Sequence, residues 1–172
     1  MRERREAAIT SLQTAFGWVG IASSSRGLLA LTLPQPAKEG ALAPLNEQWP
    51  GAPDVDRPWL GRFKDKLQRY FLGEAVTFDE PLDLDRATPF QRRVWLAVRE
   101  IPYGEVRSYG QIARRIGHPQ AVRAVGRALA SNPLPIVVPC HRVIGSDGSL
   151  VGFRGGLEMK RRLLEIENAH RH

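Results

Sequence analysis

The segment Val137-Val138-Pro139-Cys140-His141-Arg142-Val143-Ile144 contains the only cysteine of the 172-residue chain, and a histidine follows it directly. An apolar run over residues 134–138 leads into the cysteine, and the turn-forming sequence Gly145-Ser146-Asp147-Gly148 follows the segment. By composition alone, Cys140 is best interpreted as a small buried core residue, because free cysteine is among the most buried residue types. The adjacent proton acceptor raises the alternative of a nucleophile, since a base must generate the reactive thiolate.

Composition and charge restrict the class of protein. The chain is 42% hydrophobic and 25% charged, with a net charge of +7, which is ordinary for a soluble globular protein but basic. A basic balance favours a polyanionic partner such as nucleic acid, although a solvated basic surface would give the same count. There is no membrane-spanning run and no signal-peptide pattern, so we predict a cytoplasmic protein. One cysteine excludes an internal disulfide and a multi-cysteine zinc site, and we expect no metal.

The first half of the chain contains strand and helix patterns. The apolar runs 16–22 and 27–33 are separated by a serine-rich turn and predict a β-hairpin. Apolar residues at helical spacing predict a helix over residues 57–72, which ends at a glycine. A last short strand is predicted at residues 76–78.

The remaining N-terminal residues carry weaker signals. Residues 1–10 are predicted to be frayed and partly helical, and the Pro-, Ala- and Gly-rich residues 34–55 are predicted to form an irregular loop. We therefore expect a small N-terminal α/β domain over residues 1–80 and a linker over residues 81–87. The C-terminal domain then comprises residues 88–172.

Two capping boxes mark helix starts in the second half. Thr88-Pro89-Phe90-Gln91 opens the first helix, with proline at the first helical position, and Ser108-Tyr109-Gly110-Gln111 opens a short helix that reaches Ile116. The inward-facing residues of the first helix are predicted to be Phe90, Val94, Trp95, Val98 and Ile101.

The short helix, the turn Gly117-His118-Pro119 and a further helix over residues 121–129 form a helix-turn-helix pattern. In that motif the second helix enters a groove of DNA. Here it carries Arg123 and Arg127 among small residues, which suits close, shape-tolerant contact with a minor groove and an inserted arginine. Two packed helices with solvated arginines are the alternative. A C-terminal helix is predicted over residues 157–168.

The Cys-His pair needs further partners to act as a catalytic unit. Adjacent side chains in an extended segment point in opposite directions, so we expect a water to link Cys140 to His141. The histidine in turn needs an orienting acceptor, for which Glu158, Glu165 and Glu167 are all candidates. Asn132 can brace the cysteine loop through backbone hydrogen bonds, cap the preceding helix, or do both.

A sulfur nucleophile beside a DNA-binding helix suggests attack on an electrophilic carbon that DNA carries. A base inside a duplex is out of reach, so it must first be flipped out of the stack. An arginine inserted into the vacated space would then have a purpose.

Five motifs in order, TPFQRRVW, IPYGEVRSYGQIA, AVRAVGRALASNP, VPCHRVIGSDG and GFRGG, resemble the O6-alkylguanine-DNA alkyltransferase family over residues 88–167, and the N-terminal half resembles it more loosely. The resemblance implies an α+β protein with a ribonuclease-H-like N-terminal domain and a winged helix-turn-helix C-terminal domain. It implies irreversible transfer of a methyl or larger alkyl group from guanine O6 in duplex DNA to Cys140, with O4-alkylthymine as a second candidate substrate. It further implies a monomer that binds the minor groove and uses no cofactor.

The resemblance also implies roles for individual residues. Cys140 is the acceptor, His141 the water-linked base, Glu167 the orienting carboxylate and Asn132 the brace of the active-site turn. Tyr109 helps to rotate the nucleotide and donates toward the leaving guanine. The residues expected to contact DNA are Tyr109, Ala121, Arg123, Ala124, Gly126 and Ser146. Among them, Arg123 is expected to insert its side chain into the space that the flipped base leaves in the stack. The residues expected around the base and its alkyl group are Leu129, Val143, Leu150, Val151, Phe153 and Arg154.

The chain departs from the family pattern at several points. Phe153 lies where many members have tyrosine, and Arg154 lies where smaller residues are frequent. The cysteines of an N-terminal zinc site are missing. Three other functions compete: a non-catalytic binder of alkylated DNA, whose relatives lack the acceptor cysteine, a Cys-His hydrolase, and a plain transcription factor. Each of the last two leaves either the helix-turn-helix or the Cys-His-Glu set unexplained.

Overall fold

The computed structural model describes residues 6–153 and 155–168, and the chain divides into two compact units, residues 1–84 and 85–172. The units differ sharply in charge. Residues 1–84 contain ten Lys and Arg against eleven Asp and Glu, whereas residues 85–172 contain fifteen against seven. The positive excess of the whole chain therefore lies in the second unit.

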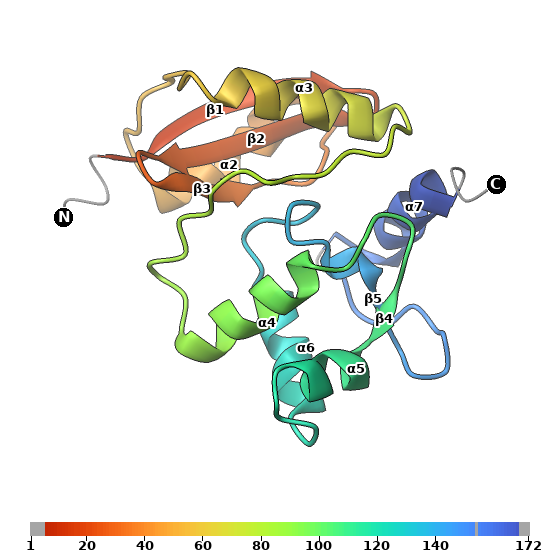
Figure 1. Cartoon of the computed structure of the whole chain (residues 1–172). Coiled ribbons are helices and arrows are strands. Elements are labelled where there is room, and N and C mark those ends of the chain that lie inside the picture. Colours follow the sequence, from red (N-terminus) through yellow and green to blue (C-terminus); the bar gives the residue numbers. More distant parts are fainter. Residues whose placement is uncertain (1–5, 154, 169–172) are drawn as a thin grey trace. The chain divides into compact units, whose positions relative to one another are not determined.

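The first unit contains a three-stranded antiparallel sheet in the order β1-β2-β3, built from β1 (Ala8–Thr14), β2 (Gly17–Ser24) and β3 (Gly27–Leu31) (Figure 1). The predicted hairpin is confirmed as β2 and β3. Residues 1–5 of the predicted frayed, partly helical start lie outside the described residues, and Glu6 is helical. The prediction is wrong for residues 8–10, because β1 pairs with β2 along its whole length. Its strand character comes from this pairing and not from a strong local pattern.

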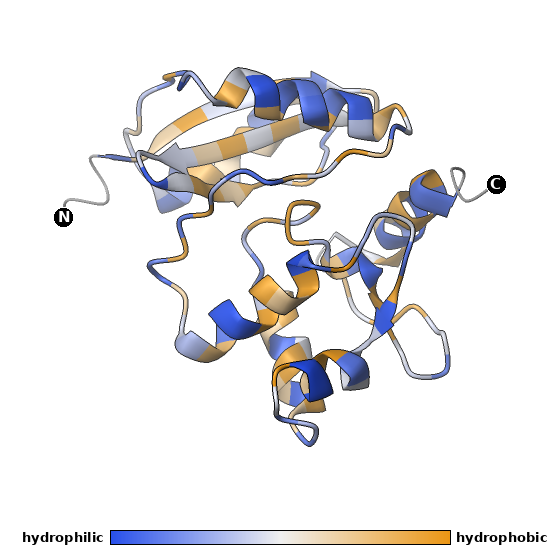
Figure 2. Ribbon diagram, viewed as in Figure 1, coloured by the Kyte–Doolittle hydropathy of each residue, from blue (hydrophilic) through white to orange (hydrophobic). Residues whose placement is uncertain are grey.

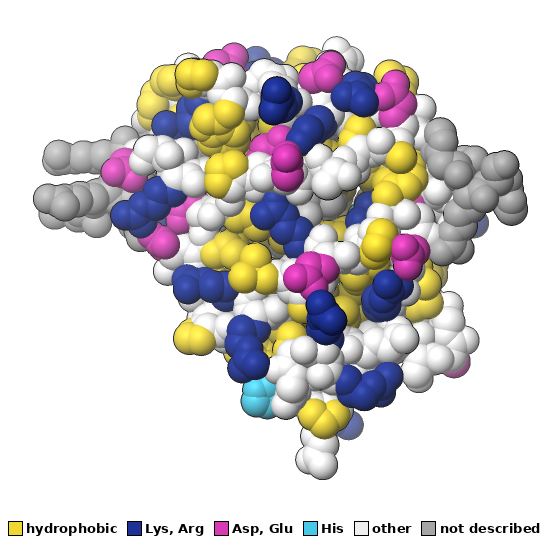
Figure 3. All heavy atoms as spheres, in the orientation of Figure 1, with side chains coloured by type: hydrophobic (Ala, Val, Ile, Leu, Met, Phe, Trp, Pro, Cys, Tyr) yellow, Lys and Arg dark blue, Asp and Glu magenta, His cyan; other side chains and the backbone are white. Residues whose placement is uncertain are grey.

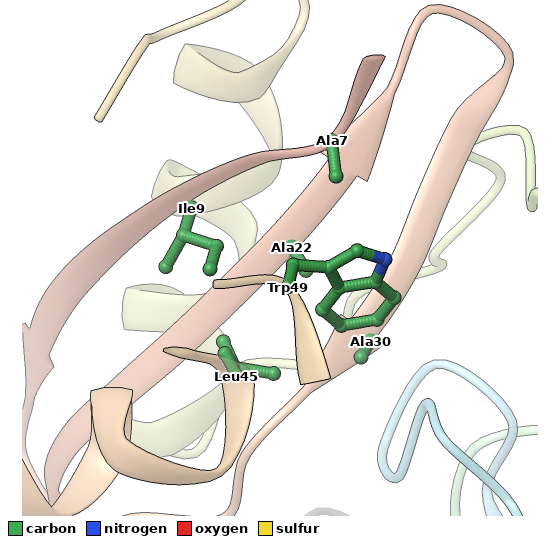
Figure 4. Close-up of a cluster of buried hydrophobic side chains, with 6 residues drawn as sticks. All are labelled: Ala7, Ile9, Ala22, Ala30, Leu45 and Trp49. Atoms are coloured by element: carbon green, nitrogen blue, oxygen red, sulfur yellow. The ribbon is translucent and has the colours of Figure 1, made fainter. Parts of the chain in front are cut away.

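Helix α2 (Lys38–Gln48) covers one face of this sheet, and Trp49 follows it directly. Side chains of paired strand residues project toward α2, and they pack with the Trp49 indole in a buried cluster of Ala7, Ile9, Ala22, Ala30, Leu45 and Trp49 (Figure 4). The predicted irregular loop over residues 34–55 is therefore wrong. The sequence did not predict this helix because it contains Pro44 and has only weak apolar periodicity. Tertiary packing stabilises it.

Helix α3 (Leu60–Phe71) lies on the opposite face and confirms the predicted helix; its outer surface is mostly hydrophilic (Figure 2). The predicted strand at residues 76–78 is wrong, since these residues have no strand pairing. The chain pairs with β3 slightly later. The Leu28 N–H donates to the Pro81 carbonyl at 2.9 Å, and the Asp83 N–H donates to the Leu28 carbonyl at 2.8 Å. The start of the expected linker is thus fixed to the first unit.

The second unit contains the predicted helices, namely α4 (Pro89–Arg99), α5 (Tyr109–Arg115), α6 (Val122–Ala130) and α7 (Leu157–Asn168). Both predicted capping boxes are present, because Thr88 and Ser108 each accept a hydrogen bond from the backbone N–H three residues later at 3.1 Å. Of the five residues predicted to face inward from α4, Phe90 is only half-buried and the other four are buried.

Helices α5 and α6 form the expected helix-turn-helix, and α4 packs against both of them (Figure 1). The Trp95 indole N–H donates to the Ala128 carbonyl at 2.7 Å in a buried contact that fixes α6 on α4. The short parallel strands β4 (Arg107–Ser108) and β5 (Val143–Ile144) connect the start of α5 to the segment after the cysteine. None of the helices in residues 6–153 and 155–168 has both the length and the apolarity needed to cross a membrane.

We predict that Thr88→Ala lowers the free energy of unfolding by about 1 kcal/mol, because it removes the acceptor that caps α4. Urea unfolding followed by circular dichroism measures the change. Thr88→Ser keeps the hydroxyl and should stay close to the original stability. Equal stability of the alanine and serine variants would show that the cap contributes nothing.

Candidate active site and DNA-binding surface

Cys140 begins a single turn of 3-10 helix, η1 (Cys140–Arg142), and is buried with 9% of its surface exposed. This turn replaces the extended conformation that the sequence suggested. The cysteine borders a cavity of about 280 Å³, which is lined by Tyr109, Gly126, Leu129, Ala130, Cys140, Gly152 and Phe153. Helix α6, the start of α5 and the loop before α7 therefore converge on the thiol.

His141 is completely buried and its Nε2 lies 2.5 Å from Oε2 of Glu167 on α7. Burial lowers the pKa of His141 below its ordinary value, despite the opposing effect of Glu167. Burial alone would raise the pKa of Glu167, but the hydrogen bonds and charges of His141 and Arg142 outweigh it and lower that pKa to about 2. The pair is thus a neutral imidazole that donates from Nε2 to an ionised carboxylate, which leaves Nδ1 as the basic nitrogen.

Arg142 supplies the positive charge that balances Glu167. Its Nε donates to Oε1 at 2.8 Å and its Nη2 to Oε2 at 3.2 Å, while its Nη1 donates to the Ile101 carbonyl at 2.7 Å. The Gly104 N–H adds a further hydrogen bond to Oε1 at 3.2 Å. The residues alone left three glutamates as candidates for the acceptor, and the sequence predicted no role for Arg142 although this residue directly follows His141.

The Cys140 thiol is neutral at rest. Burial raises its pKa, while the hydrogen bond from Asn132 and the charge of Lys160 lower it only in part. A buried thiol of this kind does not ionise spontaneously at neutral pH, so its proton must pass to a base when the sulfur reacts. The site therefore combines a protected thiol with a neutral, oriented histidine.

Asn132 bonds to the backbone on both sides of the loop before the cysteine. Its Nδ2 donates to the Val138 carbonyl at 3.0 Å, and its Oδ1 accepts from the Leu134 N–H at 2.9 Å. Within this loop, the buried Ile136 has a φ of 76°, which is a strained conformation for a β-branched residue. The bonds from Asn132 thus hold a loop that would otherwise relax.

Lys160 is a second residue of the site for which the sequence predicted no role. It is completely buried on α7, and its Nζ donates to the carbonyls of Val143, Val151 and Gly152 at 2.6, 2.9 and 3.3 Å. Burial lowers its pKa to about 8, against the raising effect of Cys140. A signal was available, because Lys160 and Glu167 lie seven residues apart on the same face of α7 as the buried Leu163.

Only some of the residues expected around the substrate line the cavity beside Cys140. Tyr109 and Phe153 are half-buried and line the cavity with the buried Leu129. The Tyr109 hydroxyl donates to the Val151 carbonyl at 2.9 Å, and the Val143 carbonyl accepts from Lys160. The side chain of Leu150 is half-buried and that of Val151 is exposed, and neither lines the cavity. Arg154 lies outside the described residues.

The residues expected to contact DNA lie on the surface of the second unit. Arg123 and Ser146 are exposed, whereas Ala121, Ala124 and Gly126 are half-buried positions of α6 and its start. Residues 106–146 contain six arginines and no Asp or Glu. Within the described part of the chain, the side chains of Arg114, Arg123 and Arg127 make no hydrogen bond or ion pair. Lys and Arg side chains also gather over α4 and α5 on the face shown in Figure 3.

Residues 6–153 and 155–168 contain no group of three His, Cys, Asp or Glu side chains that could hold a metal ion. The chemical groups of the site are therefore a thiol, a histidine with its carboxylate and arginine, a tyrosine hydroxyl and a buried lysine. These groups suit proton transfer and attack by sulfur on carbon.

Two family models match the chain. The ribonuclease-like domain of 6-O-methylguanine DNA methyltransferase matches residues 8–84, and the DNA binding domain of 6-O-methylguanine DNA methyltransferase matches residues 89–169. The chain belongs to the 6-O-methylguanine DNA methyltransferase family. The expected family and the expected two-domain α+β fold are thereby confirmed.

Individual relatives agree with this membership. The methylated-DNA–protein-cysteine methyltransferase of Mycobacterium bovis is 58% identical over 105 residues, which are 61% of this chain and 63% of that relative. The constitutive enzyme of the same name from Bacillus subtilis is 53% identical over 113 residues, 65% of this chain and 68% of the relative. The crystal structure of Mycobacterium tuberculosis OGT in complex with DNA matches with a TM-score of 0.78 and 42% identity, over 94% of this chain and 93% of that chain. The match to the M. bovis sequence thus spans slightly less than two thirds of that relative, whereas the structural match is nearly complete.

We predict that the stability of this methyltransferase-family protein depends on Glu167 at acidic pH. Since the pKa of Glu167 falls from 4.5 to about 2 on folding, its carboxylate stabilises the fold above pH 4.5, and this contribution is lost as the pH falls toward 2. The contribution is roughly 3 kcal/mol. Glu167→Gln should therefore be less stable at pH 6, and its deficit should narrow below pH 4.5.

Chemical unfolding at pH 6, 4 and 3 measures this dependence. Glu165→Gln is the matched control, because Glu165 is exposed on the same helix. If both variants show the same pH dependence as the unmodified protein, Glu167 does not carry the acid sensitivity.

Proposed function

We propose that this protein repairs alkylated DNA directly, by transferring a methyl or larger alkyl group from O6 of guanine in duplex DNA to the sulfur of Cys140. The observation that carries the proposal is the position of Cys140 at a cavity, with the His141–Glu167–Arg142 set beside it on the same short turn and α7. The helix-turn-helix that borders the same cavity contains arginines and no Asp or Glu. This charge supports DNA as the carrier of the alkyl group.

The reaction needs one proton to leave the thiol and one to reach the guanine. A water between Sγ of Cys140 and Nδ1 of His141 takes the thiol proton and passes one to the imidazole. The resulting imidazolium is stabilised by the ionised Glu167, which Arg142 holds in place. The raised pKa of the buried Cys140 thiol supports coupling of this proton transfer to attack.

The sulfur then attacks the alkyl carbon of the substrate. A carbon–sulfur bond forms as the carbon–oxygen bond breaks, and the bonding electron pair goes to the guanine. Protonation of the guanine by Tyr109 stabilises the leaving group, and for this the hydroxyl must exchange its bond to the Val151 carbonyl for one to the base. Nothing in the reaction removes the alkyl group from sulfur again, so each molecule acts once.

Access to the alkylated base requires that it leaves the duplex stack, because the thiol is buried. Arg123 is exposed and makes no ion pair with any described residue, which suits insertion into the vacated stack from the minor groove. The small residues Ala121, Ala124 and Gly126 allow the DNA backbone to approach α6 closely. We further propose that the protein is cytoplasmic and binds DNA as a monomer.

The cavity wall supports a substrate that is apolar at one end and polar at the other. Leu129 and Phe153 offer apolar surface to the alkyl group, and the Tyr109 hydroxyl and the Gly152 peptide group, which line the same cavity, offer polar atoms to the base edge. Alkylated thymine, with its smaller ring, is a second substrate of the same chemical type. A lesion binder without chemistry is the competing function, and the presence of Cys140 argues against it.

We predict that incubation with duplex DNA containing O6-methylguanine adds one methyl mass to the tryptic peptide that contains Cys140. Mass spectrometry of the peptide and nucleoside analysis of the DNA measure the two halves of the transfer. Cys140→Ala should abolish transfer and retain DNA binding. An unmodified peptide together with a surviving lesion and intact binding would instead identify a lesion binder.

We further predict that Arg123→Ala slows repair of the lesion in duplex DNA by at least about tenfold, the effect of losing one charged contact of about 1.4 kcal/mol. The reaction with free O6-benzylguanine, which needs no flipping, should slow much less. Single-turnover rates on the two substrates measure the ratio. Equal slowing on both substrates would exclude insertion of Arg123 into the base stack.

A further inference from the structure

A groove of about 420 Å³ lies beside α5. It shares no lining residue with the cysteine cavity. Strand β4, helix α5 and the turn after β5 form its walls, which include Arg107, Ser108, Gly110, Arg114 and Ser146. No Asp or Glu side chain is among the described residues that line it. The groove thus presents two guanidinium groups and two hydroxyls without a carboxylate.

Arg114 is the residue best placed to bind a ligand in this groove. Its exposed side chain makes no hydrogen bond or ion pair with any residue that the structure describes. A Cβ atom added at Gly110 would lie 3.6 Å from Nη1 of Arg114 and 3.8 Å from Oγ of Ser108. The Arg114 guanidinium and the Ser108 hydroxyl therefore both lie beside the bare Gly110 backbone.

Arg107, the first residue of β4, is held in place by hydrogen bonds of its side chain. Its Nη2 donates to a Glu105 carboxylate oxygen at 3.1 Å, and its Nη1 donates to the Val106 carbonyl at 2.9 Å. The nearest acidic residue of the facing turn, Asp147, accepts hydrogen bonds from the backbone and hydroxyl of Ser149 and does not line the groove. Arg114 is therefore the cation of this groove that has no carboxylate partner.

A second cavity that α5 borders has the opposite character. It is lined by Glu100 and Arg115 among others, and these two side chains form an ion pair at 2.9 Å. Arg107 also lines this cavity, and both arginines are already paired with a carboxylate, so an anion gains little there. Two successive arginines of one helix thus differ in whether their charge is available to a ligand.

We propose that the groove beside α5 binds a phosphate of the DNA backbone, with Arg114 as the principal contact and Ser108 and Ser146 as hydroxyl donors. Guanidinium and hydroxyl groups are the usual protein donors to phosphate oxygens, and such contacts fix the orientation of a protein on its duplex. The family resemblance places Ser146 among the residues that contact DNA, and the groove adds Arg114 from helix α5. The proposal rests on the proposed function, because it takes DNA as the ligand.

The test compares Arg114→Gln with Arg115→Gln, two exposed neighbours whose replacement changes the net charge equally. Fluorescence anisotropy with an undamaged duplex gives the dissociation constant over a range of potassium chloride concentrations. Arg114→Gln should weaken binding by about tenfold and reduce the slope of log affinity against log salt by about 0.9, the value for one lost phosphate contact. Arg115→Gln should change neither by more than about twofold, since its charge is already paired. Arg114→Lys should restore most of the slope.

Equal effects of Arg114→Gln and Arg115→Gln on affinity and slope would overturn the proposal, because the contribution would then be general charge. Inorganic phosphate at matched ionic strength should weaken binding no more than potassium chloride does. Stronger competition would mean that the groove takes free phosphate, and would also overturn the proposal. The reaction of the unmodified protein with free O6-benzylguanine tests the proposed function independently, because it involves no DNA backbone.

Discussion

The buried carboxylate of Glu167 is the constraint on which the second unit depends. It accepts hydrogen bonds from His141, from two nitrogens of Arg142 and from the Gly104 backbone, and it is 1% exposed. An ionised carboxylate in such a place is tolerated only when its charge and lone pairs are satisfied. The same contacts join α7, the cysteine turn and the segment after α4. The contacts that satisfy the buried carboxylate therefore also fix the orientation of the His141 ring.

Helix α7 contributes a second buried charge with a different task. Lys160 donates to the carbonyls of Val143, Val151 and Gly152, while Glu167 bonds to the cysteine turn two helical turns later. One helix thus holds both the cysteine turn and the segment that contains Gly152, and both border the cavity. Alkylation of Cys140 would add carbon to this packed region, and overpacking is destabilising. The reacted protein is therefore expected to be less stable than the free one.

Arginine serves two separate purposes in this unit. Arg142 is buried and paired, and it sustains the charge of Glu167. Arg114, Arg123 and Arg127 are exposed and have no ion pair among the described residues, in a stretch without any acidic residue. The first unit, in contrast, has a nearly balanced count of charges. The division of the chain into a neutral and a strongly basic unit matches the division between scaffold and proposed DNA contact.

Sequence alone determined the features that local chemistry specifies. The capping boxes at Thr88 and Ser108, the helix-turn-helix and the importance of the Cys140-His141 pair follow from residues a few positions apart. Only the tertiary structure decided which charges meet across long separations, such as Arg142 and Lys160 with their partners. It also decided that β1 is a strand and α2 a helix, because the first depends on pairing and the second on packing of Trp49. Local patterns record short-range hydrogen bonding and periodicity, whereas burial of a charge or a weak helix is stabilised by atoms that are distant in the chain.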